Sequence, residues 1–307
     1  MTGTDKGSQT LKSDSLLLAA ACIWGFAFVA QRVGMQYVGP FGFNGVRFAL
    51  GCLVLVPLIV KNRTAEHKPY PGLFSFPSLA GGLAAGLILF TGASFQQVAM
   101  VYTTAGNAGF ITGLYVIIVP IIGIALKHHT HAGTWLGAVL AAAGMYLLSV
   151  TEQFTISMGD LLVLVGAFFW ACHVHIIGWL SPRQDPLKIS ILQYAVCSIL
   201  SMIATLLFEN NTVAMYQSAI IPILYGGIMS VGVAYTLQVI AQKKARPAHA
   251  AIILSLEAVF AAIGGWIMLG EVLTPRAMSG CALMFCGMLI SQLWRMPWRE
   301  MGGGKAV

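Results

Sequence analysis

Long apolar runs separated by short polar breaks are the feature that most constrains how this chain can fold. A helix crosses about 30 Å of hydrocarbon with roughly 20 residues. Soluble domains carry about 25% charged residues, whereas only 9% of these 307 residues are charged and 58% are hydrophobic. Ten runs are long enough to span a bilayer, at approximately 15–35, 42–60, 78–99, 104–126, 132–150, 159–180, 187–208, 218–241, 247–270 and 276–294. We therefore predict an all-α integral membrane protein with ten transmembrane helices.

The distribution of lysine and arginine predicts the orientation of these helices. If the N-terminus is cytoplasmic, 14 of the 17 basic residues fall in cytoplasmic segments and only Arg276 falls in an outer loop. Positive residues are retained on the cytoplasmic side of membranes, so we expect an inner-membrane protein with cytoplasmic tails at 1–13 and 296–307. The net charge of +7 follows from this topology and gives no reason to expect nucleic-acid binding. The basic run Lys127–His131 has the same explanation, and we expect no metal site and no cofactor.

An internal repeat divides the chain into two halves, 14–151 and 158–295. Shifting the sequence by 146 residues lays Asp14 on Asp160, Trp24 on Trp170 and Pro40 on Pro186. The last runs of the halves share glycines, Gly137 with Gly280 and Gly144 with Gly287. Because each half has an odd number of spans, the second half must be inverted relative to the first. Inverted repeats are typical of alternating-access transporters, which hold substrate near the membrane midplane between the repeats.

Several short motifs resemble one transporter family. They are Trp24-Gly25, Asn44-Gly45-Val46-Arg47-Phe48, Tyr102-Thr103-Thr104-Ala105-Gly106-Asn107, and Glu257-Ala258-Val259-Phe260 followed by Leu269-Gly270-Glu271. Over about residues 14 to 295 the chain is similar to the EamA type of the drug/metabolite transporter superfamily. The resemblance implies a ten-helix exporter of amino acids, related metabolites or drugs, with a central cavity. The family pattern favours proline after the ninth-span glutamate, where this chain has Ala258.

The depth of a residue in the membrane can be counted from the start of its span, at about 1.5 Å of rise per residue. These depths predict a binding site between two gates. Aromatic and acidic residues near the midplane form the predicted substrate site: Trp24, Tyr115, Trp170 and Glu257, joined by His173 on the Trp170 side of its helix. Polar residues nearer the outside form a predicted outer gate: Gln31, Arg32, Asn44, Arg47, Gln96 and Gln97. Gln193, Tyr235 and Gln238 form a predicted inner gate.

Each of these residues also has a structural interpretation. The two tryptophans could be packing residues, although tryptophan prefers membrane interfaces. An ionisable group at the membrane centre marks a functional site by default, but Glu257 could instead be a neutral, hydrogen-bonded structural carboxyl. Arg32 and Arg47 could extend toward the headgroups rather than contribute to a gate.

These patterns favour a transporter over an enzyme, since the connecting loops are short and poor in acidic residues. We expect a monomeric secondary exporter of amino acids or related metabolites, in contact with membrane lipid, with protons as a candidate coupling ion. An exporter of drugs or hydrophobic cations, and an uptake or exchange carrier of the same superfamily, remain the alternatives. A carrier of phosphorylated compounds is disfavoured because the midplane of the predicted spans carries no lysine or arginine.

Overall fold

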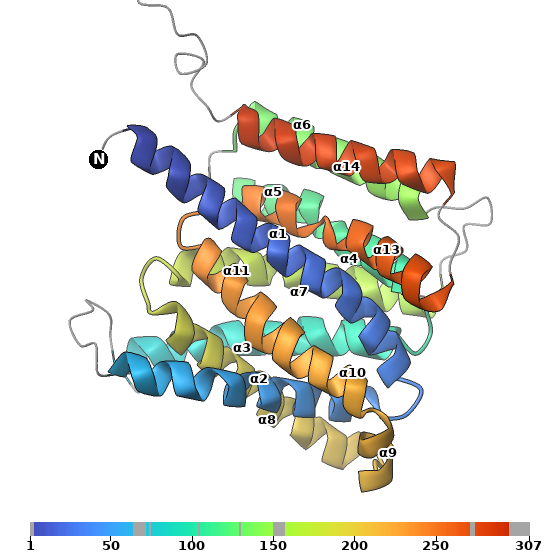
Figure 1. Cartoon of the computed structure of the whole chain (residues 1–307). Coiled ribbons are helices and arrows are strands. Elements are labelled where there is room, and N and C mark those ends of the chain that lie inside the picture. The colour runs from blue at the N-terminus through green and yellow to red at the C-terminus, as the bar shows by residue number, and fades with distance from the viewer. Residues whose placement is uncertain are drawn as a thin grey trace, which may run out of the picture.

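The structure is a computed structural model that describes residues 3–63, 72–73, 75–103, 105–128, 130–149, 157–270 and 274–294. The described residues form a bundle of helices, with no strand in these ranges (Figure 1). The first half contains α1 Gly3–Gly34, α2 Pro40–Arg63, α3 Phe76–Ala99, α4 Ala105–Gly113, α5 Tyr115–Ala125 and α6 Ala132–Ser149. The second contains α7 Met158–Leu180, α8 Pro186–Phe208, α9 Val213–Ser218, α10 Ile220–Leu224, the π-helix η1 Tyr225–Tyr235, α11 Thr236–Ala241, α12 Pro247–Leu254, α13 Glu257–Leu269 and α14 Pro275–Leu293.

Eight helical stretches among the described residues have the length and apolar composition to cross a membrane, so the chain is a multi-pass integral membrane protein. They are Thr10–Gly34, Pro40–Lys61, Phe76–Ala99, Ala108–Ala125, Met158–Leu180, Pro186–Phe208, Ile220–Ala241 and Pro247–Met268. The predicted runs 132–150 and 276–294 form shorter apolar helices, Ala132–Leu147 and Met278–Ser291. The all-helical membrane class is therefore confirmed.

The N-terminal segment differs from its expected form. The sequence predicts a polar tail over residues 1–13, but α1 is helical from Gly3 onward. Once a helix is nucleated, each further residue adds a backbone hydrogen bond at little entropic cost, which explains why the span extends into this tail. The predicted C-terminal tail 296–307 and the link 151–156 between the halves lie outside the described residues.

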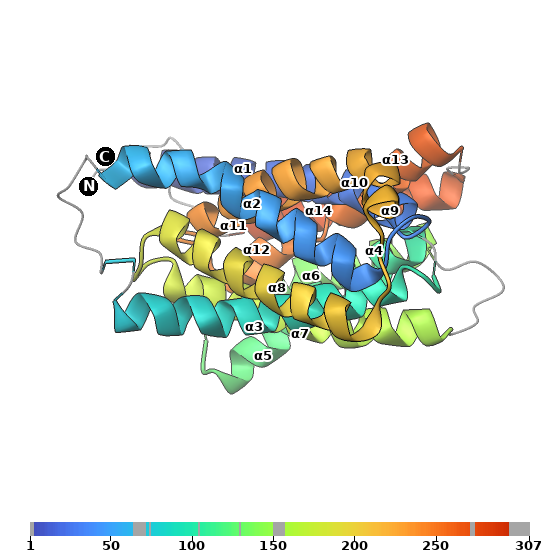
Figure 2. The ribbon, with the colours of Figure 1, turned by 90° about the horizontal axis from the view of Figure 1, so that it is seen from below.

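The bundle has two chemically different ends. One end of the bundle contains the start of α1, the end of α14 and the α5–α6, α7–α8 and α11–α12 connections (Figure 2). We call this the basic end, because its connections carry Lys127, Arg183 and the Lys243–Arg246 segment. The opposite end contains Asp160 at the start of α7 and Glu209 after α8.

Helices α6 and α14 pack as an antiparallel pair along one side of the bundle (Figure 1). A Cβ atom at Gly137 would lie 2.6 Å from the carbonyl oxygen of Gly287, and one at Gly144 would lie 2.5 Å from that of Gly280. Only glycine permits so close an approach of two backbones, the usual device of helix packing in lipid.

Three of the predicted spans are not regular α-helices, among them the run 218–241, which contains the π-helix η1. The run 104–126 is interrupted at Leu114, between α4 and α5, and the run 247–270 is interrupted at Ser255 and Leu256, between α12 and α13. At the second break the Ala258 N–H bonds to the Ser255 carbonyl three residues back, and the Ser255 hydroxyl donates to the Ile252 carbonyl. Side-chain hydroxyls that compete for backbone carbonyls bend helices in this way. The break thus forms although proline is absent at position 258.

Candidate functional site

A cavity at the middle of the bundle brings the predicted site residues together. All five predicted substrate-site residues line it: Trp24, Tyr115, Trp170, His173 and Glu257. Residues predicted for the gates also line it, namely Gln31, Arg47 and Gln96 from the outer set and Tyr235 and Gln238 from the inner set. The structure therefore gathers members of all three predicted sets around one space, which we call the central cavity.

Aromatic rings form one wall of the central cavity. The ring centroids of Trp24 and Tyr235 lie 4.6 Å apart, and those of Trp170 and Tyr235 lie 6.0 Å apart in a stacked arrangement. The indole of Trp24 donates to the Ser230 carbonyl at 3.2 Å, and the indole of Trp170 donates to Gln96 Oε1 at 2.8 Å. Satisfied indole nitrogens and ring contacts hold these side chains in defined positions. Tyr235 thus sits between the two tryptophans rather than in a separate inner layer.

A chain of side-chain amides joins three helices beside this wall. Gln96 on α3 accepts the Trp170 indole hydrogen and donates to Gln31 Oε1 on α1 at 3.0 Å. Gln31 in turn donates to the Ala27 carbonyl at 3.2 Å within its own helix. Each amide is oriented by its neighbours, so the network links α1, α3 and α7 in a specific arrangement.

The two membrane arginines occupy different environments. Arg47 is 1% exposed, donates through Nε to Asn44 Oδ1 at 2.9 Å, and packs over the rings of Phe43 and Phe48. Arg32 does not line the cavity and donates to the carbonyls of Met100 and Val101, where α3 ends. Unpaired carbonyls at a helix C-terminus favour a basic side chain there. The buried position of Arg47 excludes extension toward the headgroups in this conformation.

A buried carboxyl completes the central cavity. Glu257, the first residue of α13, is 4% exposed and interacts electrostatically with Tyr115, the first residue of α5. Among the described residues the Tyr115 hydroxyl and the Glu257 carboxyl are paired only loosely with each other, and Glu257 Oε1, Tyr115 Oη and Thr112 Oγ1 make no well-formed hydrogen bond. Buried polar atoms without a partner are costly, so these three atoms mark where a polar guest would be stabilised.

Three other predicted gate residues, Gln193, Asn44 and Gln97, do not line the cavity. Gln193 on α8 is bonded through Oε1 to the ring of the cavity residue His173 at 2.8 Å. Asn44 holds Arg47 and donates to the Ala93 carbonyl at 3.1 Å. Gln97 is fully buried, and neither atom of its amide has a partner among the described residues.

Five lining residues were not predicted: Phe28, Thr112, Val174, Ser230 and Leu254. Four of them lie three or four residues from a predicted cavity residue: Phe28 from Trp24, Thr112 from Tyr115, Val174 from Trp170 and Leu254 from Glu257. Residues at these spacings share a helix face, so helical periodicity was the signal available for them. Ser230 lies in the π-helix, whose wider turn that periodicity does not describe.

The central cavity is too small to hold a substrate in this conformation. Its volume is about 40 Å³, whereas pockets that hold small molecules are about 300–1,000 Å³. A substrate the size of an amino acid therefore cannot be accommodated until helices move apart.

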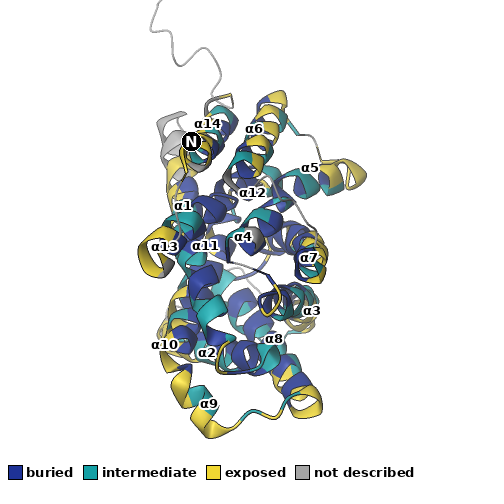
Figure 3. Ribbon diagram, turned by 90° about the vertical axis from the view of Figure 1, so that its right-hand side faces the viewer, coloured by how far each residue is buried: buried dark blue, intermediate teal, exposed yellow. Residues whose placement is uncertain are grey.

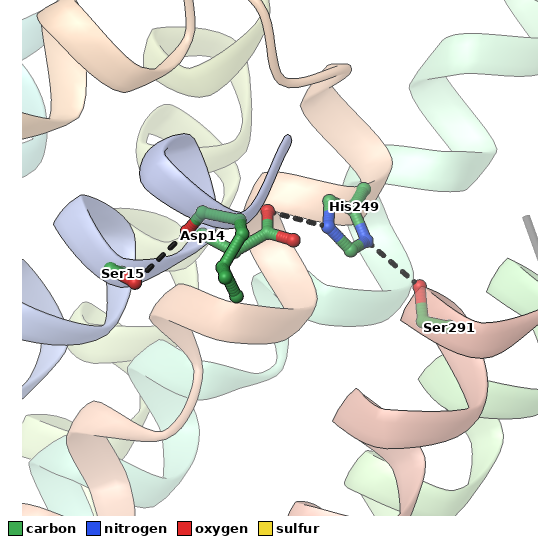
Figure 4. Close-up of polar contacts among 5 residues, drawn as sticks. Asp14, Ser15, His249 and Ser291 are labelled. Carbon is green, nitrogen blue, oxygen red and sulfur yellow. Dashed lines mark hydrogen bonds and ion pairs between the residues drawn. The ribbon is translucent and has the colours of Figure 1, made fainter. Parts of the chain in front are cut away.

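Two buried contacts join the halves at the ends of the bundle. At the basic end Asp14 Oδ1 is bonded to His249 Nε2 at 2.9 Å, and His249 Nδ1 to Ser291 Oγ at 3.1 Å; Figure 4 shows Asp14 and Ser291 on opposite sides of the ring. At the opposite end the Thr103 hydroxyl donates to Asp160 Oδ1 at 2.7 Å. We call these the basic-end contact and the opposite-end contact. Each aspartate lies in the first helix of its half and meets the beginning of the fourth span of the other half.

Comparison with known proteins supplies the family. The sequence profile of the EamA-like transporter family matches twice, at residues 11–150 and 157–292. The chain belongs to the EamA-like transporter family. This membership places it in the drug/metabolite transporter superfamily.

Two relatives that match this EamA-like chain over most of their length are named as transporters. An uncharacterized transporter of Archaeoglobus fulgidus is 33% identical, covering 95% of this chain and 89% of the relative. The threonine/homoserine exporter RhtA of Escherichia coli K12 is 29% identical, covering 85% of this chain and 84% of the relative. A solved crystal structure superposes with a TM-score of 0.74 at 19% identity, covering 94% of this chain and 99% of the other, which establishes a shared fold alone.

Proposed function

We propose that this EamA-like transporter exports small zwitterionic amino acids. The observation that carries the proposal is that one cavity contains a single arginine, Arg47, and a single carboxyl, Glu257, among its lining residues. A free amino acid presents a carboxylate and an ammonium group, which match an arginine and a glutamate in charge and hydrogen bonding. The name of RhtA, a threonine/homoserine exporter, supports this substrate class.

A second candidate is export of hydrophobic cations. Trp24, Trp170 and Tyr235 present aromatic rings to the cavity, and aromatic faces attract cations within about 6 Å. In that case Glu257 would balance the charge of the cation and Arg47 would have only a structural role.

We propose further that ten helices are arranged as two inverted halves, 14–151 and 158–295. The two matches to one family profile support this division. The glycine contacts also support it, because exchanging the halves turns the Gly137–Gly287 contact into the Gly280–Gly144 contact. The fourth span of each half is interrupted, at Leu114 and at Ser255–Leu256, and discontinuous helices at matching positions of inverted repeats form the binding sites of many transporters.

Alternating access would then proceed by opening one end contact at a time. Release of Asp14 from His249 opens the basic end, and release of Asp160 from Thr103 opens the opposite end. Following the positive-inside rule, the proposal has the basic end, where α1 begins and α14 ends, facing the cytoplasm in an inner membrane. The halves enclose the cavity within one chain, so the proposed functional unit is a monomer.

The proposal is tested by counterflow into liposomes that contain the purified protein and unlabelled threonine, with labelled threonine outside. We expect threonine to compete for uptake at least tenfold better than N-acetylthreonine, which lacks the ammonium group, or threoninamide, which lacks the carboxylate. We expect Glu257→Gln to lose the first discrimination and Arg47→Gln to lose the second. Equal competition by all three compounds would exclude recognition of a zwitterion, and competition by a quaternary ammonium compound alone would favour the second candidate.

The same liposomes test proton coupling. A pH gradient should accelerate wild-type counterflow and leave Glu257→Gln unaffected, since Glu257 is the only carboxyl among the cavity-lining residues. Glu209→Gln is the control, because Glu209 lies at the opposite end and accepts hydrogen bonds from the backbone N–H groups of Phe41 and Gly42. A response that survives in Glu257→Gln would assign the proton to another group.

A further inference from the structure

A second and larger hollow lies at the basic end, apart from the central cavity. Its volume is about 500 Å³, and its walls come from α5, α7 and the α11–α12 connection. We call it the basic pocket, because five basic side chains line it and none of the described lining residues is acidic: Lys127, Arg183, Lys243, Lys244 and Arg246. The central cavity and the basic pocket share no lining residue.

The convergence of these charges needs an explanation beyond membrane topology. The positive-inside rule requires only that basic residues stay on one side of the bilayer, which Lys61 and Lys188 do without lining the pocket. The five cations of the pocket instead come from three connections that are far apart in sequence. An anion bound in this hollow would be attracted by several of these cations at once.

Histidines supply further hydrogen-bonding groups within the pocket. Arg246 lies 3.2 Å from His131 Nε2, and the rings of His128 and His175 have centroids 5.7 Å apart. His175 is 8% exposed and its Nε2 bonds the Val119 carbonyl at 2.8 Å, so Nε2 carries the hydrogen. Its Nδ1 has no partner among the described residues and can accept a hydrogen bond from a hydroxyl of a ligand.

The pocket also lies at a depth suited to lipid headgroups. Trp179 lines it, is 58% exposed and stacks with the Arg183 guanidinium, 4.9 Å from the ring centroid. Tryptophan at the end of a span marks the membrane interface. Helix α5 reaches the edge of the bundle, and its last residues, Ile124 and Ala125, are exposed (Figure 3). Basic pockets between helices on the cytoplasmic side bind phosphate-bearing headgroups.

We propose that the basic pocket binds a phosphate group, carried either by an anionic lipid or by a soluble phosphate compound. The cations neutralise its charge, and Arg246 together with His131 donates hydrogen bonds to its oxygens. The site is independent of the substrate chemistry of the central cavity, and so the two proposals can fail separately.

The test uses the full chain, purified in a neutral detergent, and measures dissociation constants from ligand-dependent thermal shifts. The probes are dioctanoyl phosphatidylglycerol, dioctanoyl phosphatidylcholine and inorganic phosphate. We expect the wild type to bind phosphatidylglycerol or inorganic phosphate at least tenfold more tightly than phosphatidylcholine. Arg246→Gln should weaken that binding about tenfold, while Lys188→Gln, at the same end but outside the pocket, should not. If Arg246→Gln fails to fold, Lys127→Gln replaces it.

The probes also distinguish the two sources of the phosphate group. Binding of both anionic probes, each weakened by Arg246→Gln, means that the phosphate group alone suffices. Binding of phosphatidylglycerol alone assigns the site to lipid. The proposal is overturned if no anionic probe binds or if phosphatidylcholine binds as tightly as the anionic probes. It is also overturned if Arg246→Gln and Lys188→Gln weaken binding to the same extent.

Discussion

Tyr115 and Glu257 each begin the second segment of an interrupted helix, and their side chains interact within the same cavity. Each also has an oxygen atom that makes no well-formed hydrogen bond among the described residues. The two helix breaks therefore place unsatisfied polar atoms from both halves side by side. A transporter needs such atoms where substrate binds, because a site already saturated by internal hydrogen bonds has none to offer.

The first prediction separates binding from stability at tyrosine hydroxyls. Tyr115→Phe removes a hydroxyl that is paired only loosely, with Glu257, so we expect little change in melting temperature together with a threonine KM raised severalfold. Tyr225→Phe is the matched control, because its hydroxyl donates to the Ile23 carbonyl at 2.9 Å. Loss of that bond costs about 0.5–1.5 kcal/mol, so its melting temperature should fall. A fall for Tyr115→Phe as well would indicate a structural role.

The second prediction concerns the amide chain on the cavity wall. Trp170→Phe removes the donor to Gln96, and we expect counterflow to fall about tenfold because Gln96 and Gln31 lose their orientation. Trp179→Phe is the control, since Trp179 is 58% exposed and substitutions at exposed sites usually change stability by less than about 0.5 kcal/mol. Equal transport by the two variants would show that the amide chain does not position substrate.

The third prediction concerns the two contacts that join the halves. Asp14→Asn weakens the basic-end contact, and Asp160→Asn weakens the opposite-end contact. We expect the first variant to increase labelling of a cavity cysteine by a membrane-impermeant maleimide from the basic end, and the second to increase it from the opposite end. Both measurements use Ser230→Cys, at a residue that lines the central cavity, in a chain whose native cysteines are replaced. Identical labelling of the two variants would contradict a gating role.

The fourth prediction concerns the close approach of α1 to α13. A Cβ atom at Gly25 would lie 2.3 Å from the Cβ of Phe260 and 2.8 Å from the backbone nitrogen of Ala261. Overpacking of this kind costs about 1–3 kcal/mol, so Gly25→Ala should lower the melting temperature. Gly106→Ala should not, because no atom of the described residues lies within 4 Å of its added Cβ. Equal stability of the two variants would mean that α1 can shift without cost.

The length and apolar composition of the runs predicted the membrane class, because lipid imposes a strict length on each apolar run. Depth along the spans predicted which residues would come together near the midplane, since Trp24, Tyr115, Trp170, His173 and Glu257 all line the cavity. Depth was a weaker guide to the two gates, because a side chain several ångströms long can reach another level. Tyr235, predicted for an inner gate, contacts the rings of both Trp24 and Trp170.

By itself the sequence determined that the chain lies in a lipid bilayer, where its apolar runs are, and which side chains could form a polar interior. These follow from local composition, which needs no knowledge of neighbouring helices. Only the tertiary structure decided that α4–α5 and α12–α13 are interrupted, that Arg47 is buried while Arg32 bonds the end of α3, and that five basic residues converge on one pocket. Each depends on contacts between segments distant in sequence, where packing and hydrogen bonding outweigh local preference.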